Sequence, residues 1–146
     1  MKKVIYSLIL LSAIFFIACN DDLNDGVDYI SPKAVLDVDS LEVSRGETVT
    51  LKATVKDPSG ISYVSLTYAG WNVSEEIKFE EDEYQKEYSF EYSLKVPENA
   101  ELEWTEDYVK NDGTRFKIKQ QYHKLSLTCY DGVNNKNIYY FYIKAK

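Results

Sequence analysis

The chain is poor in the side chains on which most catalytic and cofactor sites depend. Its 146 residues include one histidine, two cysteines and one methionine. A general base of the commonest type therefore has one candidate, His123, in a strand pattern where histidine is more often a surface or turn residue than a catalyst. The sequence also lacks a nucleophile elbow, a glycine-rich phosphate loop and a Cys/His cluster. We therefore predict a protein that is not an enzyme and binds no cofactor.

No apolar run in the chain is long enough to span a membrane. The run Val4–Ile17 has 14 residues, whereas a spanning helix needs roughly 20. Two lysines precede this run, and Ala18 and Cys19 close it. A basic start, an apolar stretch and a small residue before a cleavage position are typical of a secretory signal. The sequence thus predicts that residues 1–18 are a cleaved signal peptide.

The end of this segment, Phe16-Ile17-Ala18-Cys19, resembles the lipobox of bacterial lipoproteins, in the looser form associated with Bacteroides-like bacteria. The resemblance implies that Cys19 receives diacylglycerol before cleavage; the alternative is an ordinary signal peptide with an incidental cysteine. Asn20-Asp21-Asp22, with Asp25 and Asp28 behind it, resembles the signal that exports such lipoproteins to the outer face of the outer membrane. A solvated acidic linker, with the anchor facing the periplasm, is the alternative.

Cleavage would leave 128 residues, enough for one domain. With 15 basic and 24 acidic residues, the mature chain has a net charge of −9, which argues against nucleic acid or anionic lipid as a partner. Acyl chains would then hold the protein to the membrane.

Because Cys19 would carry lipid, Cys129 has no partner for a disulfide, and stability must come from a packed core. Cys129 alternates in phase with Leu125 and Leu127 and is expected in that core.

Strand periodicity dominates the rest of the chain. Residues 19–33 are polar and are expected to form a flexible tether. Alternation with period two then covers 48–56, 61–68, 71–79, 88–96, 116–122, 125–129 and 137–144. Turn residues occur at Asp57-Pro58-Ser59-Gly60 and at 131–135. The phase slips at Lys124, which indicates a bulge or a break between two strands.

One long segment, Glu98–Thr114, interrupts this pattern. Residues 101–110 could form a short helical turn, which Asn111-Asp112-Gly113 would end. Residues 34–146 are therefore expected to form an all-β domain. We predict an antiparallel β-sandwich of about seven strands, with a long irregular insertion before the last two strands.

Three segments resemble parts of bacterial immunoglobulin-like domains. Residues 43–51 and 57–61 resemble the turn before the second strand and the turn after it. Residues 94–100 resemble the strand ending in Pro-x-x-Ala of Ig-like Bacteroides lipoproteins, and residues 125–132 resemble their penultimate strand. The resemblance covers about residues 34–144 and implies an Ig-like sandwich. It implies no activity, because these families are mostly of unknown function.

Oxygen ligands for calcium are present, but not in a ligating pattern. Asp57 and Asp131 are expected in turns, and Glu80-Glu81-Asp82-Glu83 groups several carboxylates. No segment has the ligand spacing of a calcium loop. The sequence therefore predicts no metal site, with structural calcium at these residues as the alternative.

Aromatic residues are the feature most suited to binding. The chain has 13 tyrosines and two tryptophans, and most alternate in phase with aliphatic core residues. Four do not fit a core face: Trp104, Tyr108, Tyr140 and Tyr142. Exposed aromatic groups mark interfaces or ligand platforms, so these four are candidates for contact with a protein or glycan. The alternative is that the insertion folds over the closing strand and buries them.

These observations predict an outer-membrane, surface-exposed lipoprotein that acts as a non-enzymatic binding module for a protein or glycan. The alternative is a structural or adhesive component, such as a spacer or fibre subunit. Asp39-Ser40-Leu41 resembles the short O-glycosylation acceptor of Bacteroides-like bacteria, which makes Ser40 a candidate for modification.

Overall fold

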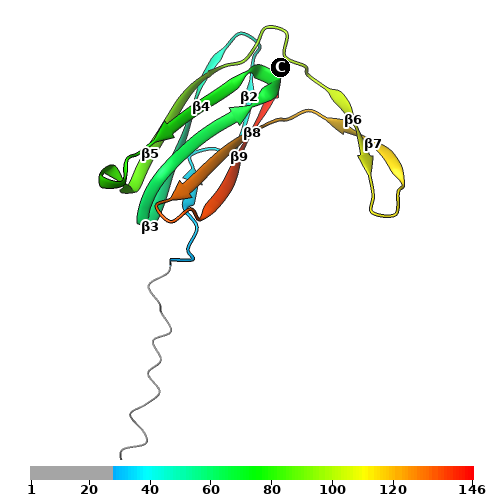
Figure 1. Ribbon diagram of the computed structural model, residues 1–146. Helices are drawn as coiled ribbons and strands as arrows, with labels where there is room; N and C mark the ends of the chain where they lie inside the picture. Colours follow the sequence, from blue (N-terminus) through cyan, green and yellow to red (C-terminus); the bar gives the residue numbers. More distant parts are fainter. Residues whose placement is uncertain (1–27) are drawn as a thin grey trace, which may run out of the picture.

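The computed structural model describes residues 28–146, which form nine strands and two single-turn 3-10 helices (Figure 1). The strands are β1 (Lys33–Leu36), β2 (Ser40–Val43), β3 (Thr48–Tyr68), β4 (Val73–Lys78), β5 (Gln85–Lys95), β6 (Trp104–Val109), β7 (Arg115–Gln120), β8 (His123–Asp131) and β9 (Lys136–Ala145). The helices are η1 (Ala69–Trp71) and η2 (Glu81–Glu83). No helix within residues 28–146 could cross a bilayer. The expected signal peptide, 1–18, and most of the expected tether, 19–33, lie outside the described residues.

The long strand β3 belongs to both layers of the fold (Figure 1). Its first part, up to Lys56, pairs with β1 on one side and β5 on the other. Its second part pairs with β4 and β8, and Ile61 at its start also pairs with Gln85 of β5. The sheet continues from β8 to β9, and β9 holds β2 in a parallel pair. These seven strands form an all-β, β-sandwich-like fold. They are not the seven predicted segments: 48–56 and 61–68 are one strand, 116–122 overlaps β7 outside this sheet, and β1 and β2 were not predicted.

The residues at 57–60 form a bend inside β3, so the prediction of a turn between two separate strands is wrong. The register of β3 against β5 shifts between Lys56 and Ile61. Pro58 has no N–H to donate to a neighbouring strand, which favours a break in the pairing there. Gly60 has a φ of +92°, a conformation that glycine adopts without strain. Turn-forming residues therefore produce a corner through which one strand passes from layer to layer.

The core lies where strand alternation places it. Fully buried side chains come from β3, β5, β8 and β9 and include Leu51, Val55, Val64, Leu66, Phe90, Leu125, Leu127, Cys129, Phe141 and Ile143. Each buried aliphatic or aromatic side chain contributes about 1.5–3 kcal/mol relative to leaving it exposed. Cys129 is fully buried, and burial raises the pKa of its thiol to about 12. Its expected place in the core is confirmed.

The predicted irregular insertion is wrong, because Glu98–Thr114 contains β6, which pairs with β7 in a two-stranded antiparallel sheet. No helical turn forms over residues 101–110. Asn111-Asp112-Gly113 connects the two strands instead, with the N–H of Gly113 donating to the carbonyl of Lys110 at 2.9 Å. Alternation in β6 is hard to recognise because most of its side chains are exposed. In Figure 1 the β6–β7 hairpin extends away from the seven-stranded sheet.

The phase slip expected at Lys124 marks a real break between strands. Strand β7 ends at Gln120 and β8 begins at His123. The two strands belong to different sheets, β7 to the hairpin and β8 to the sandwich. The slip therefore occurs where the chain leaves the hairpin and re-enters the core.

Candidate functional site

The four aromatic residues predicted as contacts do not form one platform. Tyr140 and Tyr142 lie together on β9, with ring centroids 6.4 Å apart, and their neighbours Phe141 and Ile143 are buried. Tyr142 is 36% exposed. The ammonium group of Lys124 lies 3.7 Å from the Tyr140 ring centroid, so a cation already occupies one face of that ring.

Trp104 lies at the root of the hairpin and packs against the sandwich. Its ring centroid is 4.7 Å from that of His123, and Trp71 contacts the same imidazole at 4.2 Å. The three rings hold the start of β6 against the start of β8. Trp104 is therefore partly buried and anchors the hairpin, whereas a free contact residue was the expectation.

The single histidine is only 3% exposed, so the expectation of a surface or turn position is wrong. Its Nδ1 lies 2.8 Å from the hydroxyl of Tyr68, and its Nε2 lies 2.8 Å from the carbonyl oxygen of Glu101. Because a carbonyl can only accept, Nε2 carries the proton and Nδ1 accepts from Tyr68. Burial lowers the pKa of His123, against a smaller opposing effect of Glu101. Both ring nitrogens are thus hydrogen-bonded within the fold, Nδ1 to Tyr68 of β3 and Nε2 to the segment that leads into β6.

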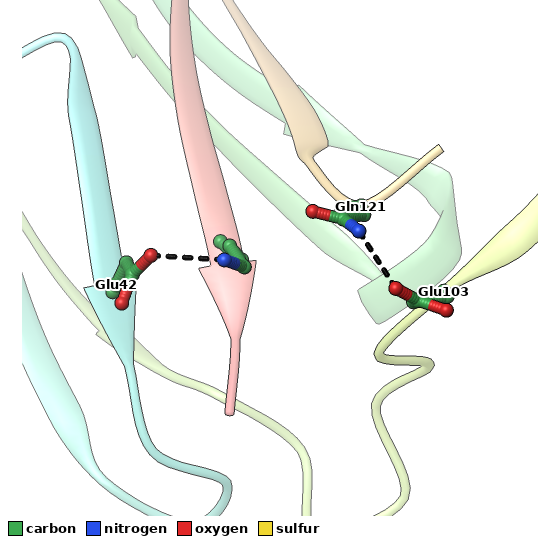
Figure 2. Close-up of polar contacts among 4 residues, drawn as sticks. Glu42, Glu103 and Gln121 are labelled. Atoms are coloured by element: carbon green, nitrogen blue, oxygen red, sulfur yellow. Dashed lines mark hydrogen bonds and ion pairs between the residues drawn. The ribbon is translucent and has the colours of Figure 1, made fainter. Parts of the chain in front are cut away.

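Polar contacts complete the hairpin root. Gln121, just after β7, donates to the carboxylate of Glu103 at 2.6 Å (Figure 2). Glu103 also pairs with Lys119, and these contacts lower the pKa of Glu103, with the Lys119 hydrogen bond as the largest cause. On the sandwich, Lys144 pairs with Glu42 at 3.0 Å and joins β9 to β2 (Figure 2). The side chains of these two ion pairs are about one-third to two-thirds exposed, so the pairs set local geometry more than stability.

The two faces of the β6–β7 hairpin differ in chemistry. One face, which we call the apolar face, carries Trp104, Tyr108, Phe116 and Ile118, with Glu106 and Gln120 beside them. The opposite face carries Thr105, Asp107, Val109, Arg115, Lys117 and Lys119. Tyr108 and Phe116 are cross-strand partners with centroids 5.1 Å apart, and Tyr108 is 55% exposed. Tyr108 was predicted from the sequence as a contact residue, whereas Phe116 and Ile118 were not. Alternation on both sides of Asn111-Asp112-Gly113 was the signal that indicates a hairpin with these side chains on one face.

Ser40 and Cys19 are the two predicted sites of covalent modification. Ser40 is exposed at the start of β2. Cys19, the expected lipid acceptor, lies outside the described residues.

No protein-family model, curated protein or solved structure matches the chain.

Proposed function

We propose that this chain is a lipid-anchored, surface-exposed lipoprotein of the outer membrane, with an Ig-like domain that binds a partner protein without catalysis. Its β6–β7 hairpin would be the contact element. The anchor rests on the lipobox resemblance at Cys19. The Ig-like assignment rests on the three resembling segments, and the observed pairing agrees with it: β3 first with β5, then β3 with β8 and β8 with β9.

The observation that carries the proposal is the apolar face of the hairpin. A two-stranded hairpin alone is marginally stable in water, and pairs with a hydrophobic face normally gain stability from a third strand or another layer. Here β6 and β7 pair only with each other among the described strands. Tyr108 stays more than half exposed, although its ring packs on Phe116. A protein surface that covers this face would bury aromatic groups of the kind that dominate binding energy.

A protein is favoured over a glycan as the partner. The rings on which a sugar could stack already have partners: Lys124 covers one face of Tyr140, and Trp104 is engaged with His123. On the hairpin, Tyr108 packs on Phe116, and the ammonium group of Lys110 lies 5.4 Å from the Phe116 ring centroid. On the hairpin, Arg115, Lys117 and Lys119 share the face opposite the aromatics. In a chain with net charge −7, this local cluster suits a partner that also presents acidic groups to the opposite face of the hairpin.

Photo-crosslinking in the native membrane tests the proposal. A photoreactive side chain in place of Tyr108 is expected to give a defined heterologous adduct. The same group in place of Val35, which is 69% exposed on β1, is the matched control and should not give that adduct. An adduct between two copies of this chain would instead favour the fibre or spacer alternative, and equal labelling from both positions would overturn the proposal.

A shortened chain provides the binding control. Trp104 and Gln120 are cross-strand partners, so replacing residues 105–119 by Asn-Gly closes the root with a two-residue turn. The shortened chain keeps the contact of Trp104 with His123. It should retain the melting temperature of the sandwich and lose binding to the purified partner; full retention of binding would show that the hairpin is not the contact element.

A further inference from the structure

Three carboxylates from distant parts of the sequence meet at one end of the sandwich. Asp28 precedes β1, Asp57 lies in the bend of β3, and Asp131 is the last residue of β8. One carboxylate oxygen from each lies within 4.8 Å of the other two. Asp57 and Asp131 are buried and Asp28 is partly buried, and like charges at this separation repel strongly where water is excluded, so a cation between the three would be stabilising.

Asp57 is the residue that most clearly lacks compensation. It is only 2% exposed. Its Oδ1 accepts a hydrogen bond from the N–H of Ser59 at 2.9 Å, but its Oδ2 has no partner. Among the described residues, Oδ2 of Asp57 is the one buried side-chain oxygen or nitrogen atom without a hydrogen-bond partner. Burial raises the pKa of Asp57, and the charges of Asp131 and Asp28 raise it further. A buried, unpaired carboxylate oxygen is costly unless something binds it.

The other two carboxylates are held firmly in place. Both oxygens of Asp131, which is fully buried, accept hydrogen bonds from the Asn135 backbone and side chain at 2.7 Å. Asp28 accepts from the N–H of Ile30 at 2.8 Å and from the hydroxyl of Ser59. The Asn135 side chain also donates to the backbone carbonyl of Asp28 at 2.8 Å. The residues around the cluster thus fix the ligand atoms without neutralising them.

No lysine or arginine among residues 28–146 supplies a compensating charge by pairing with these carboxylates. Lys33, Lys56 and Lys86 line a cavity that Asp57 also borders. Within the described residues, however, none of the three carboxylates forms an ion pair, and Lys56 pairs with Glu87 at 3.0 Å. The charge of the cluster therefore remains uncompensated by side chains.

We propose that Asp28, Asp57 and Asp131 bind one Ca²⁺ ion. The donors are all oxygen, with no histidine or cysteine, which favours a hard cation over zinc or copper. Three ligands from an irregular loop, a bend and a turn suit the flexible coordination of Ca²⁺ better than the strict octahedron of Mg²⁺. The ion would tie the segment that enters the sandwich at Asp28 to the β3 bend and the β8–β9 turn. This site is separate from the hairpin, so its failure leaves the proposed function untouched.

Thermal unfolding of the full chain, purified in neutral detergent, tests the site. Added Ca²⁺ should raise the melting temperature over that in EDTA by about 10 °C at a concentration 100-fold above the dissociation constant. Calorimetric titration should give one Ca²⁺ per chain. An equal response to Mg²⁺ alone, or no response to either ion, would overturn the proposal.

Three substitutions locate the ion. Asp57→Asn should abolish the Ca²⁺ response and melt in EDTA at or above the wild-type temperature, because one repelling charge is removed. Asp28→Asn, at the least buried ligand, should weaken binding by at least tenfold and provides the test should Asp57→Asn fold poorly. Asp82→Asn, in the exposed acidic helix η2, is the matched control and should respond as wild type. A loss of response in Asp82→Asn but not in Asp28→Asn would place the ion elsewhere.

Discussion

The contact between Trp104 and His123 leads to a prediction that separates anchoring from binding within the hairpin. Replacing Trp104 by alanine removes a ring 4.7 Å from the imidazole and exposes the hairpin root. Truncating a fully buried tryptophan costs about 3–5 kcal/mol. Trp104 is only partly buried, so about 2 kcal/mol is expected, including the aromatic contact itself. For a domain of this size, that loss corresponds to a fall of about 8 °C in melting temperature.

The imidazole supplies a second, independent measurement. Burial is the main cause that lowers the pKa of His123, so admitting water in Trp104→Ala should move that pKa up towards the ordinary value of 6.5. The chain has one histidine, so proton NMR of untagged protein follows this group without overlap. Tyr108→Ala, farther along the same face, is the control and should leave the pKa of His123 unchanged and the melting temperature within about 2 °C. If Trp104→Ala changed neither quantity, or if Tyr108→Ala changed both equally, the assignment of Trp104 as the anchor would be wrong.

Three further predictions concern the core, the pH dependence and the membrane anchor. Because burial raises the pKa of Cys129 to about 12, its thiol should react with a disulfide reagent at pH 8 only in denaturant. The rate is measured in a Cys19→Ala chain, and equal rates in the native and denatured states would place Cys129 outside the core. The pKa of His123 is lower in the folded chain than in the unfolded chain, so the unfolded chain takes up a proton first as the pH falls. The contribution of His123 to stability is therefore full above about pH 6.5 and decreases towards its folded-state pKa. The slope of this decrease is at most about 1.4 kcal/mol per pH unit. Denaturant titrations of wild type and His123→Phe should differ by this slope, and parallel curves would contradict it. Cys19→Ala should leave the membrane fraction or stall in processing, whereas a mature, membrane-bound variant would refute lipidation.

Local alternation predicted the strands that have one buried face. The segment Tyr88–Val96 places Phe90 and Leu94 in the core, as its period of two requires. The residues at 57–60 show the limit of this reasoning. Residues of this turn-forming type occur both where a chain reverses direction and where a single strand bends. Pairing with β5 and β8, which are distant in sequence, decides that this segment is a bend.

The hairpin and the carboxylate cluster were harder to predict for different reasons. Most side chains of β6 are exposed, so burial does not impose the alternation by which a strand is recognised. The cluster joins Asp28, Asp57 and Asp131, which are separated by tens of residues in the sequence. Their carboxylates come close enough to share an ion only when the chain is folded. Two of these residues were candidates for calcium from their turn positions, but Asp28 was assigned to the acidic tether, and nothing in its local sequence connects it to them.

The two candidate sites lie at opposite ends of one strand, and this arrangement has a consequence for how the protein would work. Strand β8 begins at His123, under the hairpin root, and ends at Asp131, in the carboxylate cluster. At about 3.3 Å per residue, these ends are about 26 Å apart. Asp28, where the described chain enters the sandwich, is at the cluster end, and β6 leaves from the other end (Figure 1). If Cys19 carries the anchor, Ca²⁺ would stiffen the end nearest the membrane, while the apolar face of the hairpin would be presented at the end farthest from it, where a partner protein can approach without crossing the lipid surface.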